Sequence, residues 1–224
     1  MIWNDIRSGK IKLKIGDMVY THGKSAVSAH IRVISGLYDL LKRGEPTIAN
    51  HVGCISKAIF IKGSKGTSHH YDILEALHHF KERSIYSYDD GQTDILIVRD
   101  KTIDDRMKLH IVSEVRRKYK GKIYNYGAIV AQIFDNLVSY VRGKEIYILT
   151  RLHFLPGTIC SRAWAVEIHK ATGYTYGCPP YATTPNKMID YDLAHPSKKE
   201  LIFYTKRMKE MIDRQINGTI EVNP

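Results

Sequence analysis

Cysteine is scarce in this chain of 224 residues, and its few cysteines lack the spacing of a disulfide scaffold. Only Cys54, Cys160 and Cys178 are present, and none of them belongs to a CxxC pair. Small disulfide-rich proteins and cysteine-based zinc modules carry more cysteines at closer spacing. We therefore expect a chain that is made in a reducing compartment.

Long apolar segments are also missing. No apolar run approaches the roughly 20 residues that a helix needs to cross a bilayer. The first 14 residues mix Asp5, Arg7 and several lysines with apolar residues, unlike the apolar stretch of a signal peptide. We expect no membrane anchor and no signal peptide, and a cytoplasmic or virion-associated location.

The chain has neither internal repeats nor low-complexity stretches. Hydrophobic residues make up 43% of it and charged residues 25%, as in ordinary globular proteins. A chain of this length suits one domain with its own core better than two. We predict a single domain over 1–224, with its core at about 14–190 and an amphipathic helix at 197–217.

Negative charge is in short supply, because 34 Lys and Arg residues face 23 Asp and Glu residues and give a net charge of +11. Such an excess attracts polyanions, whether nucleic acid, anionic lipid or an acidic cell-wall polymer. With fifteen tyrosines, it also leaves open a nucleic-acid-binding module. No dense basic block stands out, so basic residues that merely solvate helices account for the charge equally well.

The apolar patterns predict an α+β protein. Alternating or continuous apolar runs predict strands at 15–21, 51–62, 71–77, 84–88, 94–99 and 145–150. Helical spacing and capping residues predict helices at 25–41, 102–119, 126–140, 160–172 and from 197 onward. The helices at 102 and 197 are expected to begin with capping boxes, Thr102 with Asp105 and Ser197 with Glu200.

Cys160 follows a turn at Pro156 and Gly157 and opens a predicted helix. The free N–H groups and the positive dipole end of a helix N-terminus favour a thiolate. The same N–H groups can stabilise an oxyanion. A small buried cysteine at the start of a helix is an equally common account of this position.

His51 and Glu75 are the other candidate catalytic residues. His51 begins a predicted strand, where its ring can reach a thiol on a neighbouring helix. Glu75 lies between Leu74 and Ala76, and a carboxylate in an apolar strand is costly unless it is paired. Orienting His51 is one explanation, and an edge-strand position that faces water is the other.

Six segments, taken in order, resemble one family. They are GDMVY (16–20), HVGCI (51–55), ILEAL (73–77), DILIVR (94–99), YNYGAI (124–129) and CSRAWAVEIHKATG (160–173). Their order and spacing are similar to those of the circularly permuted NlpC/P60 cysteine hydrolases, a papain-like superfamily with YiiX-like members. The resemblance implies Cys160 as nucleophile, His51 as general base and acid, and Glu75 as the residue that orients His51. A later Thr184-Pro185 element is similar to the loop that follows the nucleophile helix in this family.

Two positions depart from the family pattern. The nucleophile is usually followed by Ser-Glu, but here Ser161 is followed by Arg162. The usual YDY appears with Asn125 at its centre. Both departures leave the three catalytic candidates in place, and they affect the residues that would line the substrate cleft.

The resemblance implies an antiparallel papain-like sheet packed against the nucleophile helix, with extra peripheral helices. It also implies hydrolysis of an amide or ester bond without a cofactor. Peptide, peptidoglycan and lipid-ester substrates all fit, and a phage-encoded peptidoglycan or peptide amidase is the preferred expectation. The alternative is a virion-associated structural protein that keeps the fold and binds other virion proteins.

Four histidines form two adjacent pairs, His69–His70 and His78–His79. Histidine is a common metal ligand, but neighbouring residues of a strand point to opposite faces. No cysteine or closely spaced histidine completes a tetrahedral set. We therefore expect no metal site.

Overall fold

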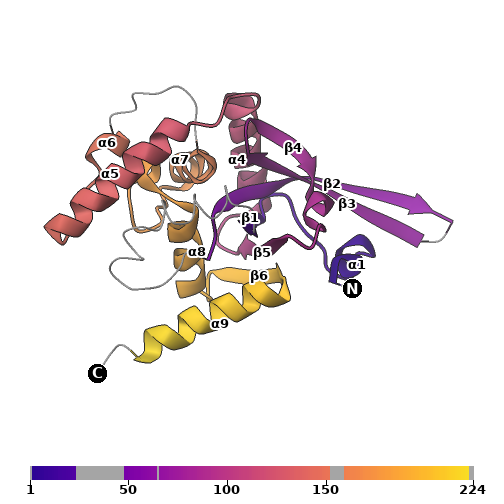
Figure 1. Cartoon of the computed structure of the whole chain (residues 1–224). Helices are drawn as coiled ribbons and strands as arrows, with labels where there is room; N and C mark the ends of the chain where they lie inside the picture. The colour runs from indigo at the N-terminus through magenta and orange to yellow at the C-terminus, as the bar shows by residue number, and fades with distance from the viewer. Residues whose placement is uncertain (1, 24–47, 65, 152–158, 222–224) are drawn as a thin grey trace.

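The computed structural model describes residues 2–23, 48–64, 66–151 and 159–221 (Figure 1). Its centre is a six-stranded antiparallel sheet with the order β4-β3-β2-β1-β5-β6. The strands are β1 (Met18–Gly23), β2 (His51–Gly63), β3 (Gly66–Ala76), β4 (Phe80–Ser84), β5 (Thr93–Asp100) and β6 (Lys199–Tyr204).

Helices surround this sheet, and the predicted α+β class is confirmed. The α-helices are α1 (Ile2–Arg7), α4 (Asp105–Tyr119), α5 (Tyr126–Arg142), α6 (Ile148–Arg151), α7 (Cys160–Thr172), α8 (Pro185–Ala194) and α9 (Lys206–Glu221). Two 3-10 turns complete the described part, η1 (Ile85–Tyr88) and η2 (Pro180–Ala182). Within it, no helix is both long and apolar enough to cross a membrane.

The sheet buries both of its faces. Along β5, Leu96 and Val98 join a core with residues of α4, α7, α8 and α9, whereas Ile95 and Ile97 join a second core with residues of α1 and η1. Because successive strand residues point to opposite faces, a strand covered on both sides needs a continuous apolar run. The sequence at 94–99 predicted such a buried strand, and the structure confirms it.

The GD segment joins two neighbouring strands. Asp17 binds Arg99 through two hydrogen bonds of 2.8 and 2.7 Å, so the start of β1 is tied to the end of β5. Gly16 has φ +93°, and a Cβ at this position would lie 2.6 Å from Cβ of Lys108. Glycine is therefore required both by the backbone conformation and by the contact with α4.

The predicted strand at 84–88 is wrong. Residues 80–84 form β4, and the chain then turns into η1. Ser84 caps this turn, because its hydroxyl accepts a hydrogen bond from the N–H of Tyr86. The local cap decides the conformation against the β propensity of Ile85 and Tyr86.

The predicted strand at 145–150 is also wrong, because residues 148–151 form α6. Side chains of α5 bind the backbone here. Ser139 accepts from the N–H of Ile146 at 2.8 Å, and Asp135 accepts from the N–H of Leu149 at 2.9 Å. These backbone donors are thus satisfied without a partner strand.

The helix predicted at 197–217 starts later than expected. Residues 199–204 form β6, which pairs with β5, and α9 begins only at Lys206. The sequence KELIFY contains four apolar residues that suit an edge strand, and pairing with β5 overrides the capping signal of Ser197 and Glu200.

The start of α4 differs in detail as well. Asp104 is its N-cap and accepts from the N–H of Met107 at 2.7 Å, so the expected Thr102 capping box is wrong. Thr102 donates instead to Asp100 at 2.6 Å. The helix predicted at 25–41 and the turn at 156–157 lie outside the described residues.

Candidate active site

The three candidate catalytic residues come from three elements that meet at one end of β2. Cys160 is the first residue of α7, His51 is the first residue of β2, and Glu75 lies near the end of β3. All three are buried, Glu75 completely. The structure thus brings together residues that are far apart in the chain.

The ring of His51 lies between a carboxylate and a thiol. Its Nε2 is 2.9 Å from Oε2 of Glu75. Its ring also hydrogen-bonds the side chain of Cys160. A partner of each kind holds the orientation of the ring.

Gly53 makes room for the His51–Glu75 contact. It pairs directly with Glu75 in the sheet register. A Cβ at Gly53 would lie 2.6 Å from Cδ1 of Ile73 and 3.0 Å from Cβ of Glu75. The missing side chain therefore leaves space for the Glu75 carboxylate to reach the histidine two residues earlier on β2.

Glu75 has two further partners that the sequence did not single out. Arg83 of β4 donates to Oε1, and the Tyr88 hydroxyl of η1 donates to Oε2. The Arg83 guanidinium also lies over the Tyr88 ring, 4.3 Å from its centroid. The buried carboxylate is therefore paired as an anion on both of its oxygens. Arg83 can be found only from the register of β4 against β3, and the sequence alone does not reveal that register.

Electrostatics favour an ion pair between Cys160 and His51. Burial raises the pKa of Cys160, but the charge and hydrogen bond of His51, with backbone hydrogen bonds at Val52 and Ser161, lower it overall. Burial lowers the pKa of His51, but the Cys160 thiolate and Glu75 outweigh it and raise the pKa to about 10. Both shifts favour the thiolate and imidazolium forms of the pair.

The other two cysteines have the opposite character. Burial raises the pKa of Cys54 and of Cys178. Cys178 is 7% exposed and Cys160 only 1%, so exposure alone would make Cys178 the more reactive thiol. Ionisation is what distinguishes Cys160.

Loop and helix contacts hold the start of α7. The hydroxyl of Ser161 is buried and donates to the carbonyl of Thr183 at 2.7 Å. Thr184 then caps α8 by accepting from the N–H of Lys187 at 3.2 Å. The Thr184-Pro185 element thus begins α8, next to the residue that holds the start of α7.

The histidine pairs have contacts and surroundings of their own. On β3, the ring of His69 contacts the rings of Phe60 and Tyr71, and His70 is hydrogen-bonded to Ser68. His78 and its neighbour are exposed beyond β3. Across the described ranges, no group of three or more His, Cys, Asp or Glu side chains is placed to hold a metal ion.

These observations define a class of protein. It is an α+β protein with a buried Cys, His and Glu cluster at one end of an antiparallel sheet. No family model and no curated protein matches the chain. Among solved structures, its fold is similar to the crystal structure of the metalloprotein YiiX from Escherichia coli O157:H7, with a TM-score of 0.50. The match has 11% sequence identity and covers 86% of this chain and 97% of that one. At this identity the likeness concerns the fold, and the described residues contain no donor set for a metal.

Proposed function

We propose that the protein is a thiol hydrolase that cleaves an amide or ester bond, with Cys160 as nucleophile. One observation carries the proposal: the ring of His51 bridges the Cys160 thiol and the buried Glu75 carboxylate. The likeness to YiiX and the ordered NlpC/P60-like segments support it. A cysteine that is buried only for packing needs no histidine hydrogen-bonded to its thiol, and no third residue that orients such a histidine.

The geometry suggests a two-step acyl transfer. The Cys160 thiolate attacks the substrate carbonyl carbon, and N–H groups at the start of α7 hydrogen-bond the oxyanion. The His51 imidazolium then gives its proton to the leaving amine or alcohol as the carbon–heteroatom bond breaks. In the second step neutral His51 takes a proton from water, the hydroxide attacks the thioester, and the thiolate leaves. Glu75 keeps its charge and holds His51 in place throughout.

Thiol alkylation tests the nucleophile. We expect iodoacetamide to label Cys160 at mildly acidic pH, because its lowered pKa keeps a thiolate where an ordinary thiol is protonated. Cys178 should react only as the pH rises towards the raised pKa of its thiol. The measurement is the rate of labelling at each cysteine as a function of pH, by peptide mapping. The variant His51→Gln should move the Cys160 profile to higher pH.

A chromogenic ester tests the reaction itself. With p-nitrophenyl acetate, the wild-type protein should release a burst of nitrophenolate and carry an acetyl group on Cys160, detected by mass. The Cys160→Ser variant should lose the burst, and the Cys178→Ser variant, which changes a thiol outside the cluster, should keep it. Labelling of Cys54 or Cys178 with Cys160 unreactive, or an undiminished burst in Cys160→Ser, would overturn the proposal.

A further inference from the structure

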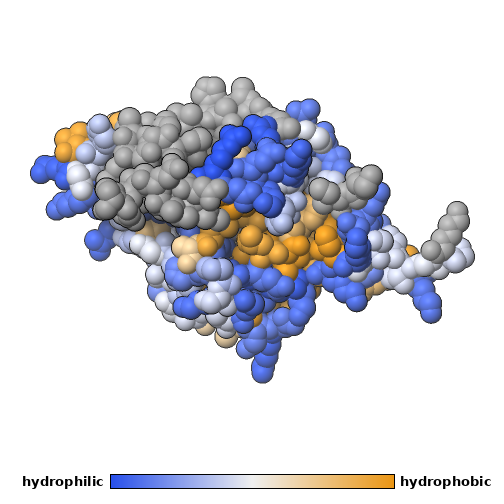
Figure 2. All heavy atoms as spheres, turned by 90° about the horizontal axis from the view of Figure 1, so that it is seen from below, coloured by the Kyte–Doolittle hydropathy of each residue, from blue (hydrophilic) through white to orange (hydrophobic). Residues whose placement is uncertain are grey.

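Helix α5 carries an apolar stripe on its outer side. Val130, Phe134, Leu137, Val138 and Val141 are all exposed, by 41% to 81%. Their spacing of four, three, one and three residues places them on one face of the helix. In Figure 1 α5 is the leftmost element, and apolar atoms lie at the left end of the molecule in Figure 2.

The other side of α5 is the side that packs against the protein. Its polar residues Asp135 and Ser139 are buried and hold the backbone of the α6 segment. Helix α6 has two exposed apolar residues of its own, Ile148 and Leu149, which are 59% and 38% exposed. The stripe of α5, together with the chain that leads from it to α6, is here called the α5–α6 surface. The stripe is more apolar than a scatter of single surface residues.

Basic residues follow the stripe in the chain. Arg142, Lys144 and Arg151 are exposed. The two acidic residues between 126 and 151 are both engaged: Asp135 is buried, and Glu145 binds Lys187 at 2.8 Å. The surface therefore combines exposed apolar side chains with exposed basic ones, on a molecule with a net charge of +11.

We propose that the α5–α6 surface docks the protein on an anionic lipid bilayer. The apolar stripe would enter the boundary between headgroups and acyl chains, and the three basic side chains would meet lipid phosphates. A second copy of the chain would bury the stripe, but it would bring the same basic residues and leave that charge unmatched. An anionic bilayer satisfies both features together. This inference is independent of the proposed hydrolysis.

Vesicle co-sedimentation tests the proposal on the full chain. We expect binding to phosphatidylcholine vesicles that contain phosphatidylglycerol, and weaker binding to phosphatidylcholine alone. The variant Phe134→Ser/Val138→Ser should bind the anionic vesicles about tenfold more weakly, because two of the inserted side chains are lost. The variant Arg142→Gln/Lys144→Gln leaves the stripe intact and should remove most of the preference for anionic lipid and most of its salt dependence.

A matched control comes from the opposite end of the molecule. The exposed pair Phe60 and Ile61 lies on β2, and Phe60→Ser/Ile61→Ser should bind like the wild type. Circular dichroism verifies that each variant is folded, and Cys160→Ser should bind vesicles normally. Absence of vesicle binding, or equal loss in the β2 control, would overturn the proposal. So would a lipid-free dimer that dissociates in the Phe134→Ser/Val138→Ser variant, which would assign the surface to a second copy.

Discussion

At the scale of single residues, Glu75 is held in its ionised state by its neighbours. Burial raises the pKa of its carboxyl, but hydrogen bonds and charge from His51, Arg83 and Tyr88 lower it overall. A carboxylate that stays charged can stabilise an imidazolium, whereas a protonated one cannot. In the proposed mechanism Arg83 and Tyr88 are positioning residues, because they act on His51 through Glu75.

Removal of the Tyr88 hydroxyl tests this role. We expect Tyr88→Phe to lower kcat/KM for the chromogenic ester by about tenfold, since one charge-assisted hydrogen bond to Glu75 is lost. The pH profile of Cys160 alkylation should shift upward, because a less firmly held carboxylate stabilises the imidazolium less. Tyr86→Phe is the matched control, because that hydroxyl donates to the carbonyl of His69 outside the cluster. An unchanged profile in Tyr88→Phe would assign Tyr88 a packing role only.

The sequence provided the central residues of this site but not their support. His51, Glu75 and Cys160 lie in segments with family-like spacing, so their positions could be predicted before their contacts were known. Arg83 and Tyr88 could not, because their contacts depend on the register of β4 and on the turn η1. The region 84–88 resembles a strand by composition, and a strand would have turned Tyr88 elsewhere.

At the scale of elements, tertiary contacts decided the cases in which propensity failed. The apolar patterns of 145–150 and 197–204 predict the wrong element type, and in both segments the deciding groups lie elsewhere in the chain. Ser139 and Asp135 bind the backbone before and within α6, and β5 pairs with β6. Strongly periodic segments such as α4 and β5 were predictable because their own apolar pattern matches the faces they bury.

The N-terminus of α4 offers a direct comparison of two capping models. Since Asp104 accepts from the N–H of Met107, Asp104→Ala should lower the free energy of unfolding by about 1 kcal/mol. Asp104→Asn keeps a capping acceptor and should cost only a few tenths of a kcal/mol. Urea unfolding followed by circular dichroism measures both. Equal losses in the two variants would mean that the cap contributes little.

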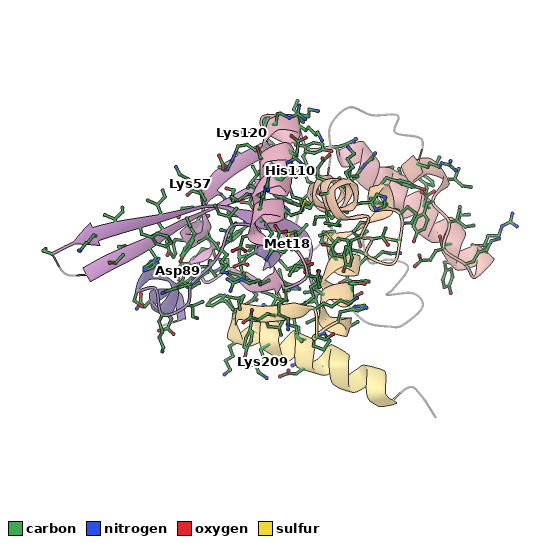
Figure 3. The ribbon with its side chains drawn as sticks, turned by 180° about the vertical axis from the view of Figure 1, so that it is seen from behind. Met18, Lys57, Asp89, His110, Lys120 and Lys209 are labelled. Carbon is green, nitrogen blue, oxygen red and sulfur yellow. The ribbon has the colours of Figure 1, made fainter. Side chains whose placement is uncertain are left out.

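Another contact of α4 lies at its other end. Lys120, labelled at the end of this helix in Figure 3, donates to Glu82 of β4 at 3.0 Å. Arg116 donates to the same carboxylate at 2.7 Å. Burial raises the pKa of Glu82, but these partners and Ser56 lower it to about 2. The helix is thereby fixed to the strand that carries Arg83.

At the scale of the whole molecule, one buried lysine connects the sheet to the helical layer. Lys199 of β6 lies 2.6 Å from Asp100 of β5 and 3.0 Å from Asp192 of α8. Asp192 in turn accepts from the hydroxyl of Tyr20 on β1 at 2.5 Å. Burial lowers the pKa of Lys199, but the two carboxylates raise it overall.

Loss of this lysine should destabilise the entire fold. Lys199→Met keeps most of the side-chain volume and leaves two buried carboxylates without their cation, which should cost about 3–5 kcal/mol of unfolding free energy. Lys198→Met changes the exposed neighbour and should stay within about 0.5 kcal/mol of the wild type. Urea unfolding of the three proteins gives the comparison. A loss for Lys199→Met as small as that for Lys198→Met would contradict this account.

The strand order also sets the sequence of events during synthesis on the ribosome. His51 and Glu75 emerge early, α7 with Cys160 follows much later, and β6 emerges after both. Until residue 204 has emerged, the edge of β5 that faces away from β1 stays open, and such edges pair readily with other chains. Translation that pauses between β5 and β6 would therefore leave a nascent chain prone to aggregation, while steady elongation closes the sheet soon after the reactive thiol has been made.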